Sequence, residues 1–462
     1  MFRKKAVDAP MFWIATSDLP TTPANAFFQR LEQALADMQF GDAVRRLAAP
    51  YYAQEASKGG QPGIAPEVYF KMLLVGFFEN LPSERAIAAR CADSLAIRTF
   101  LRYGLTERTP HHSSLTVIRQ RLGAEVYEAV FTRILQALKA QRLLKGKHLL
   151  IDSSVLAANA SLRSLRHRVT GERYREYVQR LAQAAGVDPT DARAVNRFDR
   201  QRRGRKTSNR DWRHPHDPDA KIGPDKKKVT RMLYKPEHVV DADTGAIVHV
   251  ELRPGDAADA TGLAERIGAA EARVNAALAQ PPATAQVEAI GADLGYADVA
   301  EQGWLQAGGI RTAIGELARK RDAKTLPPEV RQILRRAQQT RQSQRGVLLR
   351  RRRGELCERS FVHVLDYGGA RRTTLRGREN IGKRYFVQAA GTNLALLLRT
   401  RGGVGTLKQM WAAAQATLTA GPRAIRAHLR RWSGRWGTAA GSDRLYTHEI
   451  VWPHTWLAVV VG

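Results

Sequence analysis

The spacing of apolar residues changes near residue 147. Between residues 25 and 146 apolar positions recur at helical spacing, and strand signals are few. Pro66 stands in the first turn of one strongly apolar helix, which the breaker Asn80-Leu81-Pro82 ends. The pattern predicts an all-helical domain over 25–146, preceded by an N-terminal arm over 1–24.

Two serines inside this helical part predict a pair of short helices. Ser83 can cap a helix that runs to about Ala92, and Ser94 can cap another over Leu95 to Phe100. Two short helices joined by a tight turn are typical of a DNA-reading helix-turn-helix, and equally of a plain helical bundle. Both interpretations stay open at this level.

Beyond residue 147 the pattern predicts an α/β domain over 147–400. The apolar run His148 to Ile151 indicates a buried strand that ends at Asp152. The turn Asp241 to Gly245 separates two longer apolar runs, which favours an antiparallel hairpin. These and later runs predict strands near 232–240, 246–252, 287–292 and 310–314.

A helix is expected after the last of these strands. Cys357, Phe361, Val364 and Leu365 recur at i, i+4, i+7 and i+8 and so form one apolar seam. Glu358 is the residue beside that seam.

Positive charge dominates the composition. The 462 residues include 74 Lys and Arg against 44 Asp and Glu, a formal net charge of +30, which indicates a polyanionic partner. Residues 163–230 are polar and basic and predict a surface loop or insertion. Residues 319–353 carry a net charge of +11, and a DNA-facing arm is favoured there over a merely solvated helical insertion. Residues 401–462 form a basic C-terminal segment.

Several classes of protein are excluded by composition. The apolar stretches fall well short of the roughly 20 residues that a membrane-spanning helix needs, and no secretory signal is visible. Cys91 and Cys357 are the two cysteines, too few for a disulfide framework or a Cys-rich zinc site, and they fit a reducing cytoplasm.

Three acids stand where a metal site on nucleic acid needs them. Phosphoryl transfer commonly uses two divalent cations held by carboxylates that converge from different elements. Asp152 and Asp293 each end an apolar strand, and Glu358 lies on the helix that follows. Taken singly, each Asp is an ordinary acid in a turn; together, in this order, they match a ribonuclease-H-like arrangement.

At this point the chain resembles the DDE transposases of bacterial insertion sequences, in which a helical DNA-binding domain precedes a ribonuclease-H-like catalytic domain. The resemblance extends from about Gly63 to Arg399. It is carried by Leu149 to Ser154 with Ala158 to Ser161, Tyr234 to Asp241, Gly255-Asp256, Gly291 to Tyr296, and Cys357 to His363.

One departure from the family's pattern concerns the third acid. Members often carry Arg four residues before that Glu and Lys seven residues after it, where this chain has Gly354 and Leu365. Arg353 and His363 are the candidates to replace them. Glu355 and Glu379 therefore remain rivals of Glu358.

The resemblance implies metal-dependent DNA cleavage followed by strand transfer. Asp152, Asp293 and Glu358 would be the catalytic residues and the ligands of Mg²⁺ or Mn²⁺, as two ions. The implied partners are the terminal repeats of the element and target DNA, with a homodimer joining two ends at the nucleoid. DNA contacts are expected from Arg350, Arg351, Arg352, Arg353, Arg376, Arg378, Lys383 and Arg384.

Three other patterns resemble functional sites but lack a residue or a setting that such a site needs. The block Gly377 to Lys383 has nearly phosphate-loop spacing, but Arg384 stands where Ser or Thr must hold Mg²⁺. His214-Pro215-His216 in a polar loop favours a surface loop over a metal site. Ser153 has no recognisable His and Asp partners that would make it a nucleophile. A rival of a different class remains, a non-catalytic DNA-binding regulator or an inactivated transposase, because its charge and helices would look the same.

Overall fold

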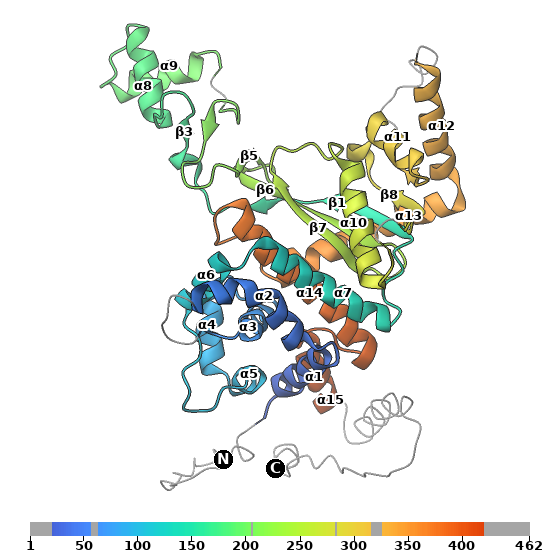
Figure 1. Cartoon of the computed structure of the whole chain (residues 1–462). Helices are drawn as coiled ribbons and strands as arrows, with labels where there is room; N and C mark the ends of the chain where they lie inside the picture. Colours follow the sequence, from blue (N-terminus) through green and yellow to red (C-terminus); the bar gives the residue numbers. More distant parts are fainter. Residues whose placement is uncertain (1–20, 57–62, 205–206, 282–283, 316–325, 420–462) are drawn as a thin grey trace, which may run out of the picture.

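The computed structural model describes residues 21–56, 63–204, 207–281, 284–315 and 326–419. The N-terminal arm up to residue 20, part of the basic segment near 319–325 and the C-terminal residues 420–462 lie outside the described residues. In Figure 1 the helical N-terminal part, the sheet and two separate projections follow one another along the long direction of the molecule.

The N-terminal region is helical, as predicted. Ser83 and Ser94 are the expected caps: their hydroxyls accept the backbone N–H groups of Ala86 at 3.2 Å and Ile97 at 3.4 Å. The helices are α1 Pro23–Asp37, α2 Phe40–Ala56, α3 Pro66–Phe78, α4 Glu84–Asp93, α5 Leu95–Leu101, α6 His112–Arg121 and α7 Ala124–Ala140.

The short helix α5 has little surface to offer a partner. Most of its residues are buried, including Ile97 and Phe100, and the Arg98 side chain donates hydrogen bonds to backbone carbonyls, among them that of Glu107 at 2.6 Å. Of the two interpretations of this helix pair, packing within a bundle has the better structural support.

The sheet is mixed and has β1 near its centre. β1 pairs with β6 antiparallel and with β8 parallel; β8 pairs with β9 parallel, and β6 with β7 antiparallel, which is the predicted hairpin. The predicted strands are all present. The strands are β1 His148–Ser153, β2 Leu156–Ala157, β5 Lys221–Pro224, β6 Thr230–Asp241, β7 Ile247–Pro254, β8 Ala289–Gly291 and β9 Arg311–Ala313.

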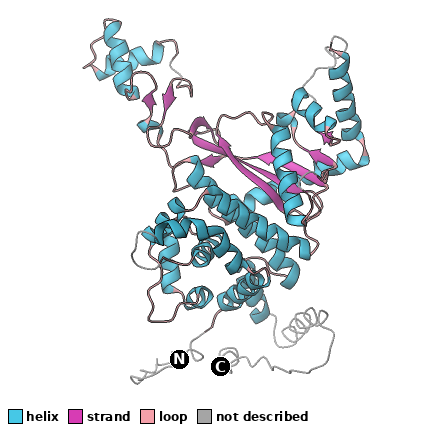
Figure 2. Ribbon diagram, in the orientation of Figure 1, coloured by secondary structure: helices cyan, strands magenta, loops and turns pink. Residues whose placement is uncertain are grey.

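Helices of the second half cover both the sheet and the N-terminal region. α13 packs on β1, β6 and β8, whereas α14 packs on β7, α7 and α3; Figure 2 shows the strands gathered between these helices. The bounds are α10 Leu263–Leu278, α11 Val299–Ala307, α12 Pro328–Gln342, α13 Gln344–Phe361 with a π-helical turn Val362–Tyr367, α14 Arg378–Gly402 and α15 Leu407–Thr419.

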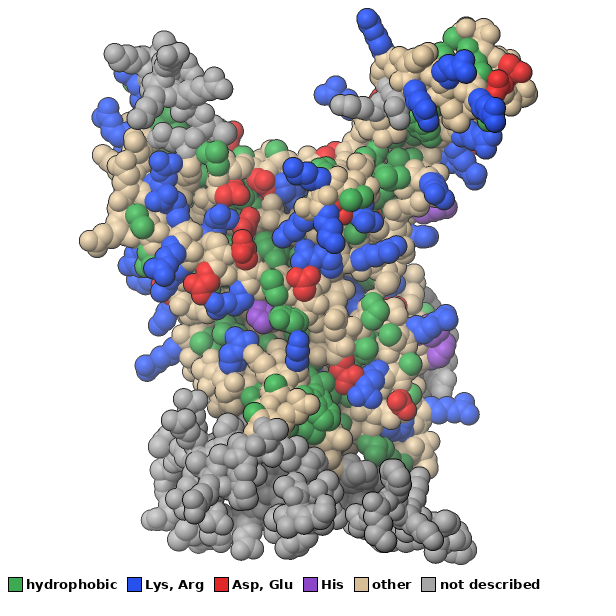
Figure 3. All heavy atoms as spheres, turned by 180° about the vertical axis from the view of Figure 1, so that it is seen from behind, with side chains coloured by type: hydrophobic (Ala, Val, Ile, Leu, Met, Phe, Trp, Pro, Cys, Tyr) green, Lys and Arg blue, Asp and Glu red, His purple; other side chains and the backbone are tan. Residues whose placement is uncertain are grey.

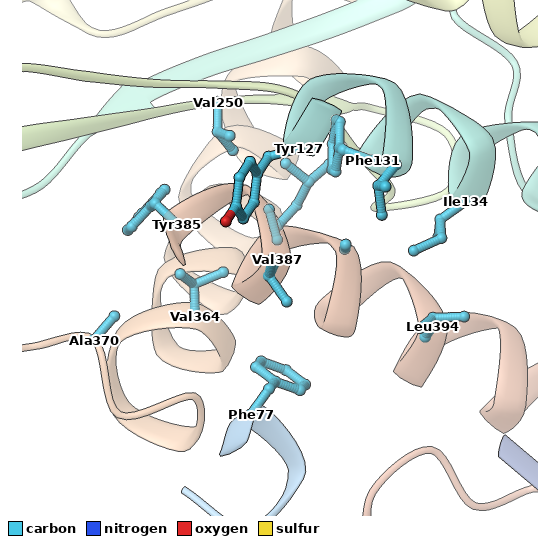
Figure 4. Packing of buried hydrophobic residues seen from close by; sticks show 14 of the residues in the cluster. Phe77, Tyr127, Phe131, Ile134, Val250, Val364, Ala370, Tyr385, Val387 and Leu394 are labelled. Atoms are coloured by element: carbon cyan, nitrogen blue, oxygen red, sulfur yellow. The ribbon is translucent and has the colours of Figure 1, made fainter. Parts of the chain in front are cut away.

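One continuous hydrophobic core joins the helical region to the sheet. Phe77 of α3, Phe131 of α7, Val250 of β7 and Leu394 of α14 belong to the same buried cluster, and Figure 4 shows them around the long helix α14. Burial of such large side chains contributes about 1.5–3 kcal/mol each. The sequence boundary near residue 147 is thus a change of secondary structure and not a gap between cores.

The basic segment 163–230 is an insertion with a core of its own. Its helices α8 Tyr174–Ala184 and α9 Ala192–Gln201 pack through Val178, Ala182 and Val195. A two-stranded ribbon, β3 Arg166–His167 with β4 Trp212–Arg213, closes it. The expectation of a surface loop or insertion is therefore refined to a small folded module.

The second basic segment is more firmly attached than its composition suggests. α12 packs on α11 and β9, and its Ala337 is buried. The start of α13 also belongs to this segment, with Leu349 buried against Gly291 of β8. Its described part is helical, as expected, but packs on the domain along one face.

A buried histidine ties β6 to α13 and α14. His238 stacks on Phe361, its Nδ1 lies 2.8 Å from the Ser360 hydroxyl and its Nε2 lies 2.6 Å from the Tyr385 hydroxyl. Ser360 donates its own proton to the Cys357 carbonyl, so His238 must donate from Nδ1 and accept at Nε2. Burial lowers the pKa of His238 to about 3, so the ring stays neutral in the folded protein.

This histidine predicts a loss of stability in acid. In the unfolded chain the imidazole of His238 takes up a proton below about pH 6.5, whereas in the folded chain it stays neutral until near pH 3. The free energy of unfolding is therefore unaffected by this group above pH 6.5 and decreases as the pH falls below that value. Between pH 7.5 and pH 5, His238→Gln should lose about 2 kcal/mol less of its free energy of unfolding than the wild type does. Urea unfolding at the two pH values measures this.

The exposed His216 supplies the control. His216→Gln should reproduce the acid sensitivity of the wild type. An identical loss in all three proteins would mean that His238 is not the group responsible.

Candidate functional site

Two of the predicted acids lie at the same end of adjacent parallel strands. β1 and β8 pair with Leu149 opposite Ile290 and Leu150 opposite Gly291, a constant offset of 141 residues. The same offset sets Asp152, the penultimate residue of β1, level with Asp293, two residues beyond the end of β8. Neighbouring strands lie about 4.8 Å apart, so the fold itself brings these carboxylates to one edge.

The third predicted acid approaches from the helix that covers this edge. Asp152 is opposite His238 in the β1–β6 pair, and both side chains of such a pair lie on the same face of the sheet. His238 contacts Ser360 and Phe361 of α13, so this face is the one that α13 covers. Glu358 is an exposed residue of that helix.

The negative charges of all three acids affect the pKa of the buried Cys357 thiol. Burial is the first cause that raises the pKa of Cys357, and the negative charges of Asp152, Asp293 and Glu358 raise it further, against the opposing effect of Arg353. Because Coulomb effects weaken with distance, all three acids lie within electrostatic range of this thiol.

Asp152 is paired with an arginine of the same helix. Arg353 Nη1 donates to Asp152 Oδ2 at 2.6 Å, and the backbone N–H of Ser153 donates to Oδ1 at 2.8 Å. The pKa of Asp152 is nevertheless raised, first because the carboxyl is buried and then because Asp293 and Asp259 lie nearby. The site therefore concentrates negative charge that one arginine only partly offsets.

Asp259 is a fourth acid of the site, and the sequence did not reveal it. The Ser153 hydroxyl donates to its Oδ1 at 2.7 Å, and Lys235 Nζ pairs with the same oxygen at 2.6 Å. A Cβ at Gly295 would stand 3.0 Å from Asp259 Oδ2 and 3.1 Å from Asp293 Oδ1, so the two acids flank this glycine. Asp259 lies between β7 and α10, in a turn whose sequence has no strand or helix pattern. Its position shortly after the family motif Gly255-Asp256 is the one sequence feature that could have identified it.

A buried ionic cluster supports the loops that carry Asp293 and Asp259. Glu237, only 1% exposed, accepts the Tyr296 hydroxyl at 2.9 Å and pairs with Arg253 and Arg266. Tyr296 ends the turn that begins at Asp293, and Arg266 donates to the carbonyl of Asp259 at 2.6 Å. Burial raises the pKa of Glu237 to about 6, against the two arginines and the tyrosine hydroxyl.

The rival third acids have other partners. Glu355 forms an ion pair with Arg359 on the exposed side of α13. Glu379 pairs with Lys383 at 2.6 Å in the first turn of α14. Neither acid is among the main causes of the pKa shifts of Cys357 and Asp152.

The predicted DNA-contacting residues divide into two groups. Arg350, Arg351, Arg376 and Arg378 are exposed, although Arg376 also donates to the Asn159 carbonyl at 3.3 Å. The other four have partners inside the protein: Arg353 pairs with Asp152, Arg352 with Asp243 at 3.1 Å, Lys383 donates to the Arg119 carbonyl at 3.2 Å, and Arg384 donates to the Leu81 carbonyl at 2.7 Å.

His214 and the block with near phosphate-loop spacing both serve packing in the fold. His214 is buried and its Nδ1 accepts the backbone N–H of His216 at 3.3 Å, so the loop is packed more tightly than a surface loop. Lys383 of the block with near phosphate-loop spacing is buried as well, 3% exposed, which leaves it no access to a nucleotide.

The chemistry of the acids fits a divalent cation. Carboxylate oxygens are the ligands that Mg²⁺ and Mn²⁺ prefer, and mutual repulsion among Asp152, Asp293 and Asp259 is the kind of strain that a bound cation relieves. In this structure Asp152 is paired with Arg353. Among the described residues, no group of three or more His, Cys, Asp or Glu side chains is arranged as a complete metal site.

A family model described as a transposase domain, DUF772, matches residues 20–121, and a model described as a transposase DDE domain matches residues 187–394. Searches of curated proteins and of solved structures gave no match. In the part of the chain that the structure describes, no helix has the length and apolar character to span a membrane. With the helical region under one transposase model and most of the acid-bearing sheet under the other, the chain belongs to the DDE transposases of insertion sequences.

Proposed function

We propose that this protein binds the ends of its insertion sequence and catalyses metal-dependent cleavage and strand transfer of DNA. The observation that carries the proposal is the level placement of Asp152 and Asp293 on adjacent parallel strands, beneath the helix that bears Glu358. The family's dependence on divalent metal agrees with a donor set made of carboxylates.

The catalytic domain is, on this proposal, ribonuclease-H-like. An antiparallel meander, β7, β6 and β1, continued by the parallel strands β8 and β9 is the strand order that supports it. The helix α13, laid on β1 and β8, supplies the third acid from above the central strands.

Asp152, Asp293 and Glu358 would hold two cations between them. Bound there, the cations would supply the Lewis acidity that activates water or a 3′-hydroxyl and offsets the charge on the phosphate. Tyr296 and Arg266 would keep the loops of Asp293 and Asp259 in place through Glu237. Arg353, paired with Asp152 in this structure, would be free to turn to a phosphate oxygen once Asp152 is neutralised by a cation.

The regulator alternative has weaker support. An inactivated copy has no need to retain Asp152 and Asp293 level on adjacent strands with Glu358 on the covering helix, nor a buried glutamate that orders the loops beside them. Two element ends must be joined in transposition, so we also propose a homodimer in the DNA complex.

The first prediction separates enzyme from regulator. Asp152→Asn keeps the size of the side chain and removes the charge that a hard cation needs, so Mg²⁺-dependent cleavage of terminal-repeat DNA should fall by at least about 100-fold. Binding of the same DNA should persist, because the mutation removes a negative charge beside it. A gel-based cleavage assay and a binding assay on the same preparation measure both.

Asp225→Asn is the matched control. Asp225 pairs with Arg231 at the exposed start of β6 and should leave cleavage unchanged. Wild-type binding without any Mg²⁺- or Mn²⁺-dependent cleavage would support the regulator instead.

A second prediction identifies the third acid. Glu358→Gln should abolish cleavage, whereas Glu355→Gln, one turn away on the same helix, should cost less than about threefold because it loses only a surface ion pair. Glu379→Gln should behave like Glu355→Gln. Loss of activity in Glu355→Gln alone would transfer the role to that residue.

A third prediction concerns the exposed arginines of α13. Arg350→Gln with Arg351→Gln should reduce the dependence of log affinity on log salt by about 1.8, since each phosphate contact contributes about 0.9. The corresponding double Lys variant keeps the charge and should retain the slope. An unchanged slope in the Gln variant would show that these side chains do not reach DNA.

A further inference from the structure

The inserted module between β2 and β5 carries a row of arginines with no partner in the protein. Arg193, Arg197 and Arg200 stand at i, i+4 and i+7 of α9, which places them within an arc of about 60° on one face. All three are exposed. In the described part of the chain none of their guanidinium groups forms an ion pair or a hydrogen bond. The opposite face of α9 packs Val195 and Phe198 against α8.

The row differs from the other charges of the module. Arg180 pairs with Glu172 at 2.9 Å, Arg202 with Asp199 at 2.7 Å, and Arg166 with Glu176 at 3.7 Å. The acids of the module thus neutralise arginines elsewhere and leave the exposed face of α9 with unbalanced positive charge.

The module is a rigid support for this row. Trp212, 5% exposed, packs against Tyr174, Tyr177 and His167, and joins the ribbon to α8. Asp191 caps α9 by accepting the backbone N–H groups at its first turn. A fixed helix loses little entropy when its side chains meet a ligand, which favours binding.

Both ends of the module are anchored beside the candidate site. β2 joins β6 with Leu156 opposite Tyr234, and β5 joins it with Lys221 opposite Leu233. Asp152 is opposite His238, four residues further along β6, so the base of the module stands about 13 Å from Asp152 at 3.3 Å per residue. Seen from behind in Figure 3, the module is the separate lobe at the upper right, with blue side chains on its surface.

We propose that α9 of this module binds the phosphate backbone of duplex DNA within about one helical turn of the cleavage point. Arg193 and Arg200 are about 10 Å apart along the helix, which matches about three nucleotide rises of one strand. The inference rests on the proposed function, because a duplex whose phosphate lies at Asp152 must pass the base of the module. Contacts of this kind are sequence-independent and add to the affinity supplied by the rest of the protein.

The test compares the full-length wild type with R193Q/R197Q/R200Q on terminal-repeat DNA that includes the flanking sequence. Removing three phosphate contacts should lower the slope of log affinity against log salt by about 2.7. Between 50 and 200 mM salt the wild type should then lose about 40-fold more affinity than the variant. Hydroxyl-radical footprinting should show protection lost near the cleavage point and kept over the more distant repeat.

The triple variant R193K/R197K/R200K is the control, because it preserves charge and should keep most of the wild-type slope. An unchanged slope and footprint in the Gln variant would overturn the proposal and point to an acidic protein as the partner of this face. The measurement uses binding alone, so a slope that falls as expected in a protein that does not cleave would refute the proposed function and still establish that α9 contacts DNA.

Discussion

The parallel pairing of β1 with β8 is the constraint on which the rest of the site depends. These strands are far apart in sequence, and their register alone decides that Asp152 and Asp293 end level with each other. A slip of one residue would turn one of the two carboxylates to the opposite face of the sheet. The buried apolar residues of both strands, including Ile151 and Ile290, oppose such a slip.

Holding several acids together costs free energy, and the surrounding residues offset it. Arg353 pairs with Asp152, and Lys235 pairs with Asp259, so the repulsion is partly cancelled when no cation is present. Glu237 is buried, and its contacts with two arginines and Tyr296 hold it in place below the loops that carry Asp293 and Asp259. Buried ion pairs of this kind add less to stability than to the definition of one geometry, a role that suits a site whose ligands come from separate strands.

The large positive charge is not evenly available to a partner. Arg352, Lys383 and Arg384 satisfy carbonyls and acids within the fold, and their charge serves packing. The arginine row of α9 and the exposed pair Arg350 and Arg351 face solvent. A net charge counted from sequence therefore overstates the number of side chains that can contact DNA, and only burial and pairing identify those that can.

The sequence by itself determined the elements and most of the acids. Apolar runs and turn residues located the strands, and the ordered acids with their flanking motifs indicated a DDE transposase, because these signals are local. Two features could not be decided from local patterns, because they depend on which side chains are buried. One is whether the helix pair capped by Ser83 and Ser94 packs in the bundle or reads DNA. The other is that segment 163–230 folds around its own core.

Asp259 and Lys383 show most clearly what only the tertiary structure decided. Asp259 sits in an irregular turn and becomes part of the site because β1 and the Asp293 turn happen to meet there. Lys383 looked like a solvent-facing phosphate contact, yet its amine is buried against the Arg119 carbonyl and Glu379. In each case a contact with a residue more than a hundred positions away, Ser153 for Asp259 and Arg119 for Lys383, is decisive, and the spacing of residues along a chain carries no information about it.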